Sequence, residues 1–257
     1  MNKETTPVKK TISPFKDQKL LEEEINKFAN RFKATVSNQA KRISDYFEMA
    51  CFNYIVQFYE HNGYTLVIRN LQGGKYKYKC SPSGVQSNFS NFEASFEVDG
   101  KEQIFEIQHN LAVQSSQDPT IFTSPDISVI KKDSIKITTE YYDSRQRFCY
   151  VNNEDLLSFC EVKQFTPYPE LLINFIGVLN ELKKEYVVNM GIQNYPLHIA
   201  PSLMISGKPN RQANNIKRSL EERYWINIIY DLFYSGSVTF SRKKVKSLRT
   251  TGRNNSL

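Results

Sequence analysis

Two acidic residues and a lysine that could act together on a phosphate lie on two predicted strands. Pro125-Asp126 opens one strand, and Glu161-Val162-Lys163 lies in the apolar run 159–165. Side chains alternate between the two faces of a strand, so Glu161 and Lys163 share a face. Two carboxylates on adjacent strands could bind one Mg²⁺, and a lysine beside them could hold a metal-bound water for attack on phosphorus. This pattern predicts hydrolysis of a phosphodiester bond.

The triplet Asp/Glu-x-Lys is not specific by itself, because it occurs four times, beginning at Asp17, Asp99, Glu161 and Glu181. The first and last lie on predicted helices, and the second lies at a predicted hairpin tip. Only the triplet at Glu161 is embedded in an apolar strand with Pro-Asp upstream. The alternative is a surface strand with an ordinary ion pair, in which Asp126 is only a turn residue.

The spacing of apolar residues predicts the elements that must position these side chains. Helical spacing predicts helices over 17–34, 43–62, 169–182 and 213–223, and Asn62-Gly63 is a C-cap signal for the second. β-rich runs predict strands over 64–68, 75–79, 92–98, 103–108, 126–130, 156–165, 197–205 and 225–230, and a hairpin made of 135–142 and 147–151. Asp99-Gly100 favours a tight type I′ turn. We expect an α/β domain with a central mixed sheet flanked by helices.

With these elements in this order, the chain resembles the PD-(D/E)xK nuclease superfamily, which has the restriction-endonuclease-like fold, over about residues 40–235. The resemblance implies that Asp126 and Glu161 bind the metal and that Lys163 is the catalytic lysine. It also implies that Glu48 is a further catalytic acid on the first core helix, although Glu48 could equally be a solvated surface residue. The implied activity is a Mg²⁺-dependent endonuclease acting on DNA, with Mn²⁺ as a substitute, and the resemblance suggests a bacterial defence system or a mobile element.

The chain departs from the superfamily pattern in the distance between its acidic residues. The gap between Asp126 and Glu161 is long and requires the inserted hairpin. Glu97 and Glu106, on neighbouring predicted strands, could supply an additional or replacement ligand. His109 follows Glu106 on the same strand and is the histidine that could join the site.

Basic residues outside this site could contact nucleic acid. Lys75, Lys77 and Lys79 alternate with tyrosines, which predicts one strand face that could follow a phosphate backbone. The alternative is a solvent-facing edge strand. The net charge is +7, and residues 232–257, which include Lys243 and Lys244, hold six basic residues and no acidic one. Such a tail could attract phosphates without sequence specificity, or it could only solubilise the protein.

We therefore expect an N-terminal helical extension over 1–39, a nuclease domain over 40–235 and a basic, flexible tail over 236–257. No apolar run approaches the length of a membrane span, and the four cysteines are unclustered, which favours a cytoplasmic protein with no membrane partner. The expected partner is DNA, with RNA as an alternative, in a homodimer or a larger defence complex. A second hypothesis is a non-catalytic nucleic-acid-binding or assembly module on the same fold.

Overall fold

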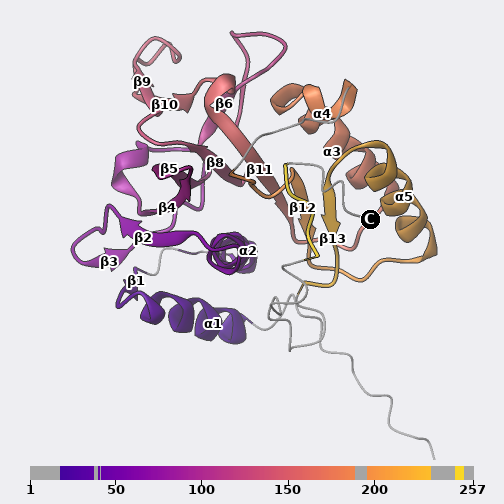
Figure 1. Cartoon of the computed structure of the whole chain (residues 1–257), viewed down its shortest axis with the longest axis horizontal. Coiled ribbons are helices and arrows are strands. Elements are labelled where there is room, and N and C mark those ends of the chain that lie inside the picture. The colour runs from indigo at the N-terminus through magenta and orange to yellow at the C-terminus, as the bar shows by residue number, and fades with distance from the viewer. Residues whose placement is uncertain (1–17, 38–39, 41, 189–195, 233–246, 252–257) are drawn as a thin grey trace, which may run out of the picture.

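The computed structural model describes residues 18–37, 40, 42–188, 196–232 and 247–251, which form a mixed α/β fold (Figure 1). Within these residues, the α-helices are α1 (Gln18–Arg31), α2 (Ile43–His61), α3 (Pro169–Leu182), α4 (Glu185–Val188) and α5 (Arg211–Arg223). They flank a mixed sheet of seven strands. The predicted central mixed sheet with flanking helices is therefore confirmed.

The seven-stranded sheet has an antiparallel part and a parallel part. Its order is β13 (Asn227–Ile229), β12 (Ser202–Ile205), β11 (Leu156–Lys163), β8 (Ile127–Lys131), β5 (Lys101–His109), β4 (Asn91–Val98) and β2 (Thr65–Arg69). Strands β11, β12 and β13 pair in parallel, whereas the pairs from β11 to β2 are antiparallel. Parallel neighbours need crossover connections, which α3 and α5 provide. The two parts meet where β8 pairs with β11.

Two predicted turns connect the elements of the antiparallel part. Gly63, directly after the C-cap of α2, has a φ of 87°. Asp99 and Gly100, between β4 and β5, have φ values of 51° and 75°. Positive φ at both central residues is the signature of the type I′ turn, so this prediction is confirmed.

A second sheet occupies the long gap between Asp126 and Glu161. It has the order β7 (Phe122–Thr123), β6 (Ala112–Gln114), β10 (Phe148–Val151) and β9 (Lys136–Thr138). Strands β9 and β10 pair antiparallel, which is the hairpin expected in this gap. Val113 and Val151 of this sheet belong to the same buried cluster as Ile130 and Phe159 of the central sheet. The insertion is therefore a layer of the fold.

Helices α1 and α2 cover one face of the central sheet, and α3 and α5 lie on the other side (Figure 1). Leu21, Ile25 and Phe28 of α1 belong to the same buried cluster as α2 and the sheet. The ring of Phe28 lies 6.0 Å from that of Phe92 on β4. The helix expected as an N-terminal extension thus contributes to the main core.

Part of the predicted basic tail is also packed on the domain. Thr250 forms a β-bridge with Ile199, and Arg249 Nη1 donates hydrogen bonds to the carbonyl oxygens of Glu221 at 2.7 Å and Ile226 at 3.0 Å. Residues 247–251 are therefore not a free tail. Lys243 and Lys244 lie outside the described residues.

The remaining short elements are a two-stranded sheet of β1 (Thr35–Val36) and β3 (Lys75–Tyr76), and the 3₁₀ turns η2 (Gln86–Asn88) and η3 (Asn153–Asp155). The predicted strand over 75–79 is thus wrong in its extent, since β3 ends at Tyr76. In the described part of the chain, no helix combines the length and apolar character needed to cross a membrane.

Candidate active site

The pairing of β8 with β11 brings the predicted acids together. Cys160 on β11 lies opposite Ile127 on β8, so Asp126, directly before β8, faces the last residues of β11. The backbone N–H of Val162 donates to Asp126 Oδ2 at 2.6 Å. Asp126 is therefore held against the Glu161-Val162-Lys163 segment despite the intervening second sheet.

Lys163 connects the two carboxylates. Its Nζ lies 2.6 Å from Glu161 Oε2 and 3.1 Å from Asp126 Oδ2. Both carboxylates are largely buried, and the lysine side chain is 32% exposed. Three residues that the sequence singled out thus form one cluster, with the ammonium group between two acids from different strands.

Burial and mutual repulsion disturb the ionisation of this cluster. Burial, followed by the charge of Asp126, raises the pKa of Glu161 to about 7 despite the neighbouring Lys163. Burial also raises the pKa of Asp126, and Lys163 only partly opposes it. For Lys163, burial disfavours the ammonium form, but Asp126 and Glu161 outweigh it and raise the lysine pKa, so the side chain stays charged.

The carboxylate oxygens of Asp126 and Glu161 are suitable ligands for a hard divalent cation. Carboxylate oxygens are the ligands Mg²⁺ prefers, and it retains several waters, so two protein ligands are enough. Each carboxylate binds Lys163 through one oxygen, and no described residue donates a hydrogen bond to Asp126 Oδ1 or Glu161 Oε1. The described residues contain no group of three His, Cys, Asp or Glu placed to hold a metal ion. The site therefore offers two carboxylates rather than a complete protein cage.

Glu48 approaches the cluster from α2. Its Oε1 lies 2.7 Å from His109 Nε2 and accepts a hydrogen bond from Asn110 Nδ2. Its charge is near enough to contribute to the raised pKa of Asp126. His109 thus contacts an acid of the candidate site. Sequence reasoning missed Asn110, for which the available signal was an asparagine directly after a strand, a residue type that tolerates left-handed turns.

The two other candidate acids lie elsewhere. Glu97 is exposed near the β4–β5 turn and pairs across the strands with Glu102. Glu106 is buried, and its carboxylate accepts hydrogen bonds from Gln108 Nε2 at 2.7 Å and from the Asp133 backbone at 2.9 Å. In the part of the chain that the structure describes, neither contacts Asp126 or Glu161.

The predicted row of three lysines does not form one exposed face. Lys75 is exposed, and Lys77 is half-buried with its Nζ 4.9 Å above the Phe89 ring. Lys79 is only 1% exposed, and its Nζ donates to Gln86 Oε1 at 2.9 Å and to the Asn110 carbonyl at 2.8 Å. Burial lowers the pKa of Lys79 to about 8. The expectation that Lys79 faces a phosphate backbone is therefore wrong, because its ammonium group is buried and donates to Gln86 and to the backbone at Asn110.

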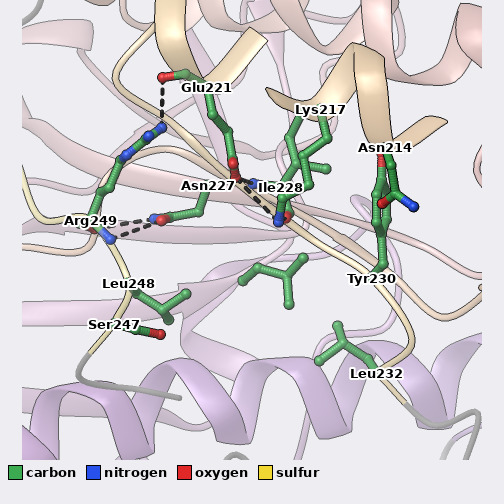
Figure 2. Close-up of a pocket in the computed structure, with 11 residues that line it drawn as sticks. Asn214, Lys217, Glu221, Asn227, Ile228, Tyr230, Leu232, Ser247, Leu248 and Arg249 are labelled. Carbon is green, nitrogen blue, oxygen red and sulfur yellow. Dashed lines mark hydrogen bonds and ion pairs between the residues drawn. The ribbon is translucent and has the colours of Figure 1, made fainter. Parts of the chain in front are cut away.

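A cavity of about 430 Å³ lies away from the carboxylate cluster, between α5, β13 and residues 247–249 (Figure 2). Its cationic side chains are already engaged: Lys217 Nζ donates to the Ile228 carbonyl, and Arg249 Nη1 donates to the Glu221 carbonyl. Among the described residues that line this cavity, neither cationic side chain is therefore free to select a ligand.

Comparison with known protein families, with curated protein sequences and with solved structures finds no match to this chain. The fold and the site define a mixed α/β protein with two largely buried carboxylates around one lysine, at the ends of adjacent central strands. A third acid, Glu48, approaches from the first core helix.

Proposed function

We propose that this protein is a metal-dependent nuclease of the restriction-endonuclease-like fold that hydrolyses phosphodiester bonds of DNA. The observation that carries the proposal is the contact of Lys163 Nζ with both Asp126 and Glu161. One acid directly precedes β8 and the other lies on β11, and both have raised pKa values in largely buried positions. Perturbed titratable groups gathered in this way are typical of functional sites.

Asp126 and Glu161 would hold Mg²⁺, or Mn²⁺ in its place. When bound, the ion supplies Lewis-acid stabilisation of the phosphate and lowers the pKa of a coordinated water. The oxygens Asp126 Oδ1 and Glu161 Oε1, to which no described residue donates, are the available ligands. When both acids are ionised, the single lysine leaves an excess of negative charge that a cation would offset.

The chain's own residues orient the reactants. The Val162 amide fixes Asp126 Oδ2 at 2.6 Å, so this carboxylate cannot rotate freely. Lys163 remains an ammonium ion and can donate hydrogen bonds to the attacking water or to a phosphate oxygen as charge develops there. Fixed donors of this kind need little reorganisation during the reaction, which is the source of their catalytic effect.

Purified protein with DNA and Mg²⁺ tests the proposal. Lys163→Ala should lower the cleavage rate by roughly a hundredfold or more, as expected for the loss of an electrostatic donor. The matched control is Lys131→Ala, which removes another lysine–carboxylate pair, to Asp155 at 3.0 Å, away from the site. Circular dichroism should show both variants folded. Undiminished cleavage by Lys163→Ala would contradict the assignment.

One observation favours a second candidate, a non-catalytic nucleic-acid-binding or assembly module. Lys163 already pairs with both carboxylates, and the described residues hold no group of three metal-ligating side chains. A structural ion pair would look similar. Thermal unfolding with added Mn²⁺ separates the two candidates, because an ion that binds only the folded state raises the melting temperature, and Asp126→Asn should remove that increase.

The remaining expectations belong to the same proposal. A nuclease of this type would take DNA as its substrate in the cytoplasm and act in bacterial defence or in the biology of a mobile element. We propose a homodimer or a subunit of a larger complex, which light scattering of the purified protein would test. Cleavage of matched RNA and DNA oligonucleotides would distinguish the two nucleic acids.

A further inference from the structure

The residues at the end of β5 connect Glu48 on α2 with Asp126 before β8. His109 Nε2 lies 2.7 Å from Glu48 Oε1, and Asn110 Nδ2 donates to the same oxygen. The backbone N–H of Asn110 donates to the Asp126 carbonyl at 2.9 Å. Two consecutive residues therefore contact both acids that flank this end of the sheet.

The position of His109 is not explained by packing alone. Its side chain is 1% exposed, between the rings of Phe52 at 5.2 Å and Tyr78 at 6.1 Å. The contact with Glu48 does not have hydrogen-bond geometry, and neither ring nitrogen has a hydrogen-bond partner among the described residues. Burying unsatisfied nitrogens is costly, and a phenyl ring would fill similar space without that cost. The polar group that the imidazole meets is Glu48.

Asn110 is itself fixed from the opposite side. Its φ of 50° is left-handed, a conformation that asparagine adopts more readily than most residues. Its Nδ2 also donates to the Lys79 carbonyl at 2.8 Å, and Lys79 Nζ donates back to the Asn110 carbonyl at 2.8 Å. Gln86 Oε1 in turn holds Lys79 Nζ at 2.9 Å. The amide that meets Glu48 therefore has little freedom to move.

We infer that His109 and Asn110 are positioning residues that fix Glu48 Oε1, so that the carboxylate acts on the reaction at Asp126 through Oε2. No described residue donates a hydrogen bond to Glu48 Oε2, which leaves that oxygen available to a water or a substrate group. This inference rests on the proposed nuclease function. It adds His109 and Asn110 to the candidate site, with the buried Lys79 holding Asn110 in place.

Steady-state cleavage kinetics test the inference. His109→Phe keeps a packed ring without nitrogens, and Asn110→Gly keeps the left-handed backbone without the amide. Each should lower kcat by about 10- to 100-fold, the usual effect of losing a residue that orients a reactive group, with KM for DNA unchanged. His109→Gln, which keeps a polar nitrogen that can contact Glu48, should have a kcat between those of His109→Phe and the wild type.

The control for the glycine substitution is Asn70→Gly. Asn70 also has a left-handed φ, 55°, and its side-chain amide donates to backbone carbonyls of Ser87 and Phe89 away from the site. Asn70→Gly should leave kcat unchanged even if it lowers stability. Equal losses of kcat in Asn70→Gly and Asn110→Gly would contradict a positioning role.

A double-mutant cycle with Glu48→Ala completes the test. If His109 and Asn110 act through Glu48, His109→Phe and Asn110→Gly will cause no further loss of kcat in the Glu48→Ala background. Multiplying effects would overturn the inference. The same cycle can be measured by urea unfolding whether or not the protein cleaves DNA. The changes in the unfolding midpoint caused by Glu48→Ala and Asn110→Gly should not be additive. A lack of cleavage by the wild type therefore counts against the proposed function, and additive midpoints count against this inference.

Discussion

Glu161 Oε2 lies 2.6 Å from Lys163 Nζ, and both residues belong to β11. The pleat of the strand places side chains two residues apart on the same face, so the strand geometry alone brings these two side chains together. The ion pair does not restore ordinary ionisation, since burial and Asp126 raise the pKa of Glu161 to about 7. The charged form of Glu161 is therefore less favourable in the folded protein than in the unfolded chain.

The raised pKa of Glu161 predicts that Glu161→Gln stabilises the protein at alkaline pH. A folded-state pKa raised from 4.5 to about 7 means that the carboxyl contributes stability fully below pH 4.5, which is lost as the pH rises through 7. At 1.36 kcal/mol per pKa unit, the variant should be more stable than the wild type at pH 8 by about 3 kcal/mol, although cleavage is lost.

Urea unfolding of both proteins at pH 8 and pH 4.5 measures the difference. The advantage of Glu161→Gln should shrink to roughly 0.4 kcal/mol at pH 4.5, where the wild-type carboxyl is protonated in the folded protein and half protonated in the unfolded chain. Lower stability of the variant at pH 8 would mean instead that attraction to Lys163 outweighs burial and the repulsion from Asp126.

Local patterns were sufficient to predict the elements that frame the site. The apolar spacing over 43–62 predicted α2, and the Asp99-Gly100 pair predicted the β4–β5 turn. The shared face of Glu161 and Lys163 follows from strand period alone. Their approach to Asp126 could be proposed only by resemblance, because it depends on which strands pair across the inserted sheet, and strand period carries no information on that pairing.

Non-local contacts account for the parts that the sequence did not predict. Alternation of Lys75, Lys77 and Lys79 with tyrosines is a local pattern, whereas burial of Lys79 depends on Gln86 and Asn110, which arrive from later segments. In the sequence, Arg249 is likewise indistinguishable from the other basic residues of the predicted tail. In the structure it donates to backbone carbonyls near α5 and β13. Oxygen acceptors distant in sequence determine both positions.

Gly207, shortly after β12, lies very close to the backbone that follows Lys163. We therefore expect Gly207→Ala to destabilise the protein. A Cβ there would lie 2.5 Å from the Phe165 carbonyl oxygen and 2.7 Å from Thr166 Cα, both backbone atoms. We expect a loss of about 1–3 kcal/mol of unfolding free energy and reduced cleavage. Gly177→Ala is the control, because no described atom other than the neighbouring backbone of α3 lies within 4 Å of its Cβ position, and it should stabilise by roughly 0.5–1 kcal/mol. Similar melting temperatures for the two variants would contradict the packing argument.

The burial of Lys79 predicts different roles for the three lysines in DNA binding. If the exposed Lys75 and the half-buried Lys77 contact phosphates, Lys75→Gln and Lys77→Gln should each reduce the slope of log affinity against log salt by about 0.9. Lys79→Met should leave that slope unchanged, since its ammonium group is already bound to Gln86 and Asn110. Fluorescence anisotropy with a labelled duplex, from low to moderate salt, measures the slopes. A smaller slope for Lys79→Met would show that this lysine reaches DNA after all.

The burial of His198 predicts that stability depends on acidic pH independently of the candidate site. Its ring is buried, 4.6 Å from the ring of Phe105, and Tyr59 Oη lies 3.2 Å from its Nδ1. Burial, with a smaller contribution from the charge of Lys183, lowers the pKa of His198 from 6.5 to about 3. Between these values the unfolded chain binds the proton and the folded protein does not, so stability falls as the pH decreases.

His198→Phe should therefore flatten the dependence of stability on acidic pH. Between pH 8 and pH 5, the wild type should lose about 2 kcal/mol more unfolding free energy than the variant, because 1.36 kcal/mol is lost for each pH unit below 6.5. At pH 8 the variant should be the less stable protein by about 1 kcal/mol, since it lacks the contact with the Tyr59 hydroxyl. Urea unfolding of both proteins at pH 8, 6.5 and 5 measures these differences, and titration of the carboxyls common to both cancels at each pH. Parallel stability curves would mean that His198 becomes protonated in the folded protein as readily as in the unfolded chain, which its burial beside Phe105 opposes.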